Sequence, residues 1–172
     1  MDSLTLSHVV ISLIAIAAGF VVVYGFFNAN RMPRTTHLFL LTTFLTSLTG
    51  FIFFKFDQLL PSHITGIIAL VVLVPTCIAL YMKNLAGAWR RIYVIGAVLS
   101  LYLNVFVLVV QLFLKVPALH ALAPGAPANP EPPFKIAQGV VLVLFIVIGF
   151  LAVKRFHPDG FARPAPSRTW ER

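Results

Sequence analysis

Five long apolar runs constrain this chain more than any other feature of its sequence. They cover roughly residues 5–27, 36–54, 62–82, 92–114 and 136–153. A helix needs about 20 mostly apolar residues to cross a hydrocarbon core about 30 Å thick, and each run has roughly that length. Membrane-spanning strands would instead show about 10 residues of alternating polarity. The sequence therefore predicts an all-α, polytopic integral membrane protein, a bundle of five transmembrane helices.

The composition agrees with a membrane protein. Only 10% of the 172 residues are charged and 59% are hydrophobic, whereas soluble chains carry about 25% charged residues. The net charge of +8 does not indicate nucleic acid, because the basic residues lie at the ends of apolar runs rather than on one face of a domain. A single cysteine, Cys77, excludes an internal disulfide and a thiolate metal cluster. We expect the lipid bilayer as surroundings and no nucleic-acid partner.

The distribution of lysine and arginine predicts the orientation. Ten of these residues fall in the first and third connections and the C-terminal tail, whereas three, Lys55, Lys115 and Lys135, fall on the other side. Cytoplasmic segments carry the excess of positive charge. We therefore expect the N-terminus outside and the C-terminus in the cytoplasm of a bacterial-type inner membrane. The start of the chain lacks the basic segment of a secretory signal, so the first run is interpreted as a retained helix.

The segments outside the apolar runs are also interpreted from composition. Residues 1–155 are expected to form one transmembrane domain with a proline-rich external loop at 115–135, of which 124–133 should be extended and semi-rigid. The basic tail, 156–172, is predicted to be largely disordered and attracted to anionic lipid head groups. An aromatic belt is expected at the cytoplasmic helix ends, from Tyr24, Tyr81, Trp89 and Tyr93.

Polar and small residues predict which side of each helix faces the bundle, since apolar side chains carry little such information in lipid. One sector of the fourth run holds Tyr93, Gly96, Ala97, Ser100, Asn104, Gln111 and Lys115. The second run has a threonine-rich face, which we interpret first as a packing surface. Polar groups accumulate toward the predicted external ends, at His8, His63, His120, Gln111 and Gln138.

Two interpretations of these stripes involve no redox chemistry. In the first, the chain is a non-catalytic accessory, assembly or interaction subunit that works with other membrane subunits, with an outward-facing polar pocket and polar side chains that bond neighbouring helices. In the second, it binds a small amphipathic, quinone-like ligand in an otherwise apolar site. The candidate ligand-binding residues are Ser12, Ser100, Asn104, Gln111 and Gln138.

A third interpretation is a haem or metal site. His8 and His63 lie at similar predicted depth, as the two axial ligands of haem b would, and His120 would supply a third imidazole for zinc or copper. No HExxH or CxxCH motif is present. All five acidic residues lie outside the apolar runs, which argues against ion-coupled transport and paired-carboxylate hydrolysis. Without a nucleophile or phosphate-binding motif, an enzyme is not indicated.

The charge distribution generates a direct test of topology. A C-terminal fusion to a reporter that is active only in the cytoplasm should be active, and one that is active only outside should be silent. Paired reporter assays in intact cells measure both. Activity of the external reporter would contradict the predicted orientation.

Overall fold

The computed structural model describes residues 3–53 and 61–158, and within these ranges the chain forms helices joined by short turns and loops. Within these ranges the side chains of Leu4 and of residues 51–53 and 61–63 are not described. The elements are α1 (Ser3–Phe27), α2 (Pro33–Phe53), α3 (Pro61–Cys77), the π-helical turn η1 (Ile78–Met82), α4 (Ala88–Lys115), α5 (Pro117–Leu122) and α6 (Pro132–Arg155).

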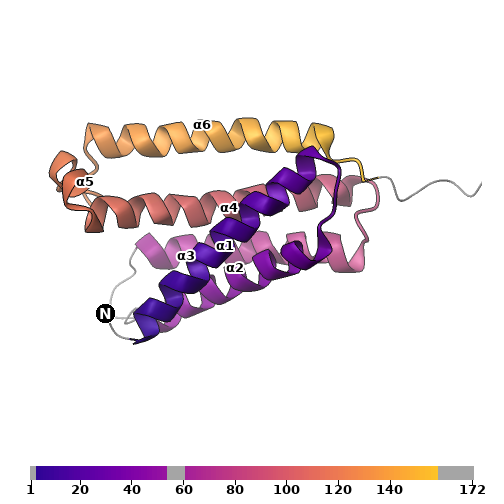
Figure 1. Cartoon of the computed structure of the whole chain (residues 1–172), viewed down its shortest axis with the longest axis horizontal. Coiled ribbons are helices and arrows are strands. Elements are labelled where there is room, and N and C mark those ends of the chain that lie inside the picture. Colours follow the sequence, from indigo (N-terminus) through magenta and orange to yellow (C-terminus); the bar gives the residue numbers. More distant parts are fainter. Residues whose placement is uncertain (1–2, 54–60, 159–172) are drawn as a thin grey trace, which may run out of the picture.

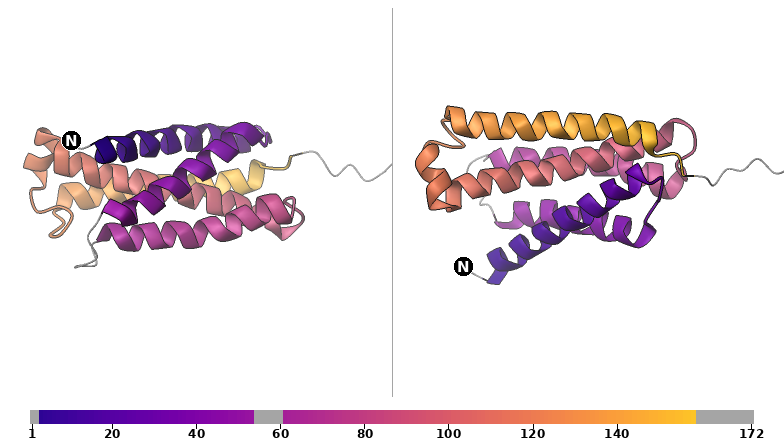
Figure 2. Two further views of the ribbon diagram at one scale, coloured as in Figure 1. Left: turned by 90° about the horizontal axis from the view of Figure 1, so that it is seen from below. Right: turned by 45° about the horizontal axis from the view of Figure 1, so that its top comes forward.

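The long helices lie alongside one another and alternate in direction along the chain (Figures 1 and 2). One end of the bundle holds the start of α1, the end of α4 and the short helix α5, and we call it the α5 end. The other holds the end of α1, the start of α4 and the end of α6. We call this the basic end, because it carries Arg31, Arg34, Lys83, Arg90, Arg91, Lys154 and Arg155.

Four helical segments are long and apolar enough to cross a membrane. They are Thr5–Phe27, Ile64–Met82, Ala88–Lys115 and Pro132–Arg155. These correspond to four of the five predicted runs, although α4 begins at Ala88 and α6 at Pro132, four residues earlier than predicted. The all-helical fold is confirmed, and α2 is not among the four segments.

Helix α4 is the centre of the bundle, since α1, α3 and α6 all pack against it. Gly96 permits the closest approach: a Cβ at this position would lie 3.1 Å from Cβ of Thr76 on α3, and closer still to its hydroxyl. Thr76 is fully buried and its hydroxyl donates to the carbonyl of Val72. On the α1 side, Gly19 similarly admits the side chains of Leu101 and Phe39. Small residues thus set the distances between helices, as is usual in membranes.

A cluster of aromatic side chains closes the basic end. The rings of Phe26 and Phe156 are 4.8 Å apart, and the Tyr93 ring meets Phe26 edge-on at 5.4 Å. All three are fully buried, and the Tyr93 hydroxyl lies 3.3 Å from Oγ1 of Thr36 on α2. One prediction is therefore wrong, because Tyr93 belongs to the core rather than to an interfacial belt. Phe156, the first residue of the predicted tail, is buried, and residues 159–172 lie outside the described part.

Arg90 secures the end of α6 at the same place. The guanidinium Nη1 donates to the carbonyl oxygens of Val153, at 3.3 Å, and of Phe156. The last carbonyls of a helix have no intrahelical partner and carry partial negative charge, so an arginine stabilises them. Although Arg90 is about 60 residues away in sequence, it holds Phe156 in the aromatic cluster.

The proline-rich segment at the α5 end is folded rather than extended. It forms α5 and then a series of turns from Pro124 to Ala128 before α6 begins. A second, smaller hydrophobic cluster holds it against α4 and α6, and its buried members are Phe113, Ala123, Ala126 and Phe134. The prediction of an extended bridge is wrong because these apolar side chains gain more by packing together than by remaining in solvent.

The contact between α3 and α4 leads to a prediction for paired glycine variants. Gly96→Ala should destabilise the protein by about 1–3 kcal/mol, because the new methyl group overlaps the buried Thr76 side chain. Gly139→Ala is the matched control, since a Cβ there meets nothing within 4 Å. Thermal unfolding in detergent would measure both. Equal stability of the two variants would contradict the close α3–α4 packing.

Candidate polar site at the α5 end

The helices are tightly packed toward the basic end and less so toward the α5 end. On α4, seven of the nine residues 93–101 are buried, whereas residues 102–112 are all at least partly exposed. On α1, no residue whose burial is described before Ala15 is buried. Figure 1 shows why: α1 crosses the bundle obliquely and diverges from α4 and α6 as it approaches the α5 end. The polar stripe of α4 therefore passes from a dry core into a more open region.

Asn104 marks this transition. Its amide Nδ2 donates to Oγ1 of Thr43 on α2, at 3.1 Å, so the stripe faces α2 as well as α1. One turn deeper, Ser100 is fully buried and its hydroxyl has no hydrogen-bond partner among the described residues. The same is true of the Thr46 hydroxyl on α2. Buried hydroxyls are nearly always paired in native proteins. The hydroxyls of Ser100 and Thr46 are exceptions among the described residues, and they lie near the bonded amide of Asn104.

His8 and Thr49 join α1 to α2 nearer the end of the bundle. His8 Nδ1 lies 2.8 Å from Oγ1 of Thr49, whose hydroxyl also lies 2.7 Å from the carbonyl of Leu45. The tautomer of the imidazole decides which of the two, His8 Nδ1 or the Thr49 hydroxyl, is the donor. The hydroxyl of the predicted ligand-binding residue Ser12 donates to the carbonyl of His8, so its hydrogen bond lies within α1.

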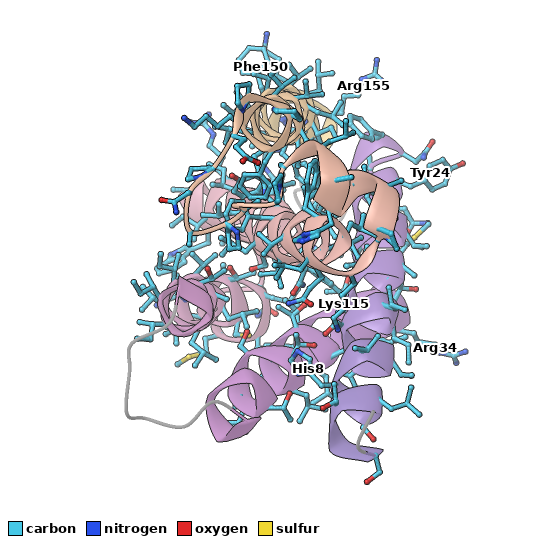
Figure 3. The ribbon with its side chains drawn as sticks, turned by 90° about the vertical axis from the view of Figure 1, so that its left-hand side faces the viewer. His8, Tyr24, Arg34, Lys115, Phe150 and Arg155 are labelled. Atoms are coloured by element: carbon cyan, nitrogen blue, oxygen red, sulfur yellow. The ribbon has the colours of Figure 1, made fainter. Side chains whose placement is uncertain are left out.

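Lys115 lies beside His8, although more than a hundred residues separate them. Its ammonium group is close enough to act electrostatically on the imidazole. Figure 3, which looks onto the α5 end, shows the two side chains near each other where α1, α2 and α4 face one another. Within residues 3–53 and 61–158 the only carboxylate is that of Glu131, and it accepts from the backbone N–H of Gly125. No described acidic group therefore neutralises Lys115.

The two predicted glutamines have different surroundings. Gln111 is half-buried on the face that carries Asn104 and Lys115, and it makes no hydrogen bond to a described residue. Gln138 instead belongs to the contact between α6 and α4, where Nε2 donates to the carbonyl of Phe106 at 3.2 Å. Its Oε1 is buried without a partner in the described part. The structure thus groups Asn104 with Gln111 and separates Gln138 from them.

The three histidines of the predicted haem or metal site are not seen together. His63 lies in the first turn of α3, but its side chain is not described. The exposed His120 lies on α5 with Nδ1 3.3 Å from the carbonyl of Phe113. Among the residues that were described, no three histidine, cysteine or acidic side chains gather as metal ligands would. A haem between His8 and His63 stays a prediction.

Sequence reasoning missed the partners of the predicted residues. The threonine-rich face of α2 predicts packing, and the stripe on α4 includes Lys115 without indicating a role for it. The available signal was their spacing: Thr42, Thr46 and Thr49 share one face of α2, with Thr43 beside it. Nothing in the sequence specifies that this face meets Asn104 and His8, because those contacts bridge elements 40 to 60 residues apart.

Comparison of the chain with protein-family models, with curated proteins and with solved structures found no match.

Paired and unpaired polar groups in α4 generate opposite predictions. Asn104→Leu and Thr43→Val should each lower stability, and the double variant should show a coupling of about 0.6 kcal/mol, a typical value for interhelical bonds in membranes. Ser100→Ala should leave stability unchanged or raise it, because it removes a buried hydroxyl that has no partner. Unfolding in mixed micelles would measure all four variants. A large loss from Ser100→Ala would contradict this assignment.

Proposed function

We propose that this chain is a non-catalytic interaction protein of an inner membrane, and that it binds another molecule through the α5 end. The binding face consists of the outer parts of α1, α2 and α4. We define its polar residues as the α5-end site: His8, Thr49, Asn104, Gln111 and Lys115. In the proposed orientation this site opens to the outside, and the basic end faces the cytoplasm.

The proposal includes five membrane crossings. What supports the fifth is the direction of the helices: α1 and α3 both begin at the α5 end, so the chain between them must return, and α2 runs back alongside both. Hydroxyl groups on α2 are compatible with lipid, because Thr42, Ser47 and Thr49 donate to carbonyls of the preceding turn.

The basic residues of the described part support the proposed orientation. They gather at the basic end, whereas only Lys115 and Lys135 lie at the α5 end. Exposed Tyr24 and Tyr81 lie at that same basic end, where an aromatic belt would meet the lipid head groups.

One observation carries the proposed function, namely the uneven packing of α4. A helix that served only as a structural core would be buried along its whole stripe. Here the stripe is buried from Tyr93 to Leu101 and partly exposed from Tyr102 onward, and the exposed part holds the Gln111 amide and the Lys115 ammonium group, which pair with no described side chain. Polar groups at such a depth are unfavourable in lipid and are usually functional. A molecule bound between α1, α2 and α4 would satisfy them.

The α5-end site combines one imidazole, one hydroxyl group, two amides and one ammonium group. Among the described residues it holds neither a carboxylate nor a nucleophile beside a general base. Recognition is the chemistry that such a set supports. An accessory subunit would use it to hold a partner, and a ligand-binding protein to hold a small amphipathic molecule.

Photo-crosslinking tests the location of the binding face. A benzophenone amino acid placed at Gln111 should yield one dominant adduct of defined mass in native membranes. At Val143, an exposed residue on α6 that is 61% accessible, it should label only bulk lipid. Mass spectrometry of the purified protein reads out both. Identical adduct patterns at the two positions would overturn the proposed site.

A further inference from the structure

A cavity of about 530 Å³ lies at the start of α4, at the basic end of the bundle. It is lined by Leu85, Gly87, Ala88, Arg90 and Arg91. Gly87, Ala88 and Arg91 are exposed, so the cavity opens to the surface. A Cβ at Gly87 would meet nothing within 4 Å. Binding sites for small molecules have volumes of about 300–1,000 Å³. The cavity therefore has room for a molecule larger than a single inorganic anion.

Positive charge gathers at the end of the bundle that holds the cavity. Among residues 3–53 and 61–158, every lysine and arginine except Lys115 and Lys135 lies at this end, whereas the single carboxylate, of Glu131, lies at the α5 end (Figure 1). A hollow lined by charge of one sign concentrates ions of the opposite sign. The cavity therefore selects an anion.

The two arginines of the cavity have donors available for such an anion. Nη1 of Arg90 donates to carbonyls at the end of α6, but Nε and Nη2 make no hydrogen bond to a described residue. Arg91 makes neither a hydrogen bond nor an ion pair with any described side chain. The nearby Lys83, by contrast, lies over the Trp89 ring, 5.7 Å from its centroid. Guanidinium groups match phosphate oxygens through paired hydrogen bonds, so the two arginines suit a phosphate.

An exposed apolar strip continues from the cavity along the outside of α4. Arg91, Ile95 and Leu99 follow one another at intervals of four residues and so share one side of the helix. Ile95 is 53% accessible and Leu99 is 37% accessible. At 1.5 Å per residue, they lie about 6 Å and about 12 Å from Arg91 along the helix. A molecule that filled the cavity and followed this strip would be anionic at one end and apolar at the other.

We infer that the cavity binds the phosphate head group of an anionic phospholipid, whose acyl chains lie along the strip formed by Ile95 and Leu99. Anionic lipids give the cytoplasmic leaflet its negative charge, and basic pockets on the cytoplasmic side of membrane helices bind their head groups. The inference rests on the proposed orientation and not on the α5-end site, which lies at the opposite end of the bundle. The two sites can therefore be tested separately.

The ordinary role of basic residues in topology does not account for this arrangement. An arginine that only fixes the orientation of a helix requires neither a cavity beside it nor an exposed apolar strip below it. Arg34 provides the comparison, because it is exposed in the first turn of α2 at the same end but does not line the cavity. Arg34→Gln is therefore the matched control for Arg91→Gln.

Native mass spectrometry of the full-length protein, released from a neutral detergent, tests the inference. The probes are phosphatidylglycerol and phosphatidylcholine with identical acyl chains, and deacylated phosphatidylglycerol. We expect one phosphatidylglycerol per chain, bound about tenfold more tightly than phosphatidylcholine, because the choline group brings a positive charge to the arginines. Arg91→Gln should remove this preference, since one charge-assisted hydrogen bond contributes about tenfold in affinity. Arg34→Gln should retain it, and Arg91→Lys should retain part of it.

Several outcomes would overturn the inference. Equal binding of the two lipids by the parent protein would show that the site does not select an anion, and this comparison requires no variant. An unchanged preference in Arg91→Gln, or an equal loss in Arg34→Gln, would show that the lipid does not bind in the cavity. Equal binding of the deacylated head group would identify a soluble phosphate as the ligand. Thermal unfolding checks that each variant is folded, and the exposure of Arg91 predicts no loss of stability.

Discussion

The fold depends on the close approach of α4 to its neighbours over the half of its length that lies at the basic end. Gly96 brings α3 into contact through Thr76, and Gly19 brings α1 against Leu101. Lipid tails are as apolar as the side chains of a helix, so no hydrophobic effect drives helices together within a membrane. The helices associate instead by close packing and by hydrogen bonds. Small residues at these crossings are therefore the main determinant of which helices touch.

The same constraint explains the open region at the α5 end. Helices that cross obliquely cannot be in contact along their whole length, and α1 contacts α4 at Gly19 and, nearer the basic end, through Phe26 and Tyr93. Beyond that crossing, polar contacts tie α2 to its two neighbours: Asn104 with Thr43, and His8 with Thr49. The segment around α5 closes the far side of α4 through its own hydrophobic cluster and leaves the α1–α2 side less covered. Packing at one end thus leaves the other end less covered, which is where the proposed binding face lies.

The sequence predicted the stripe on α4 more successfully than the site. Gly96, Ala97 and Ser100 are buried as their spacing required, and Asn104 faces another helix. The predicted pocket combined residues from several helices, and the structure does not place all of them together. Gln138 lies in the contact with Phe106, away from Asn104, whereas His8 is bonded to Thr49. A periodic pattern specifies the face of a helix, but it does not specify which helix lies opposite.

What the sequence alone determined is the set of apolar helices, the end at which positive charge gathers and the inward face of α4. These follow from local properties, namely the length of an apolar run, the residues at its ends and the 3.6-residue period. Only the tertiary structure decided that Phe156 is buried under Arg90, that the proline-rich segment folds back, and that Lys115 lies beside His8. Each of these depends on the crossing geometry of helices distant in sequence, which is set by the shapes of both partners together.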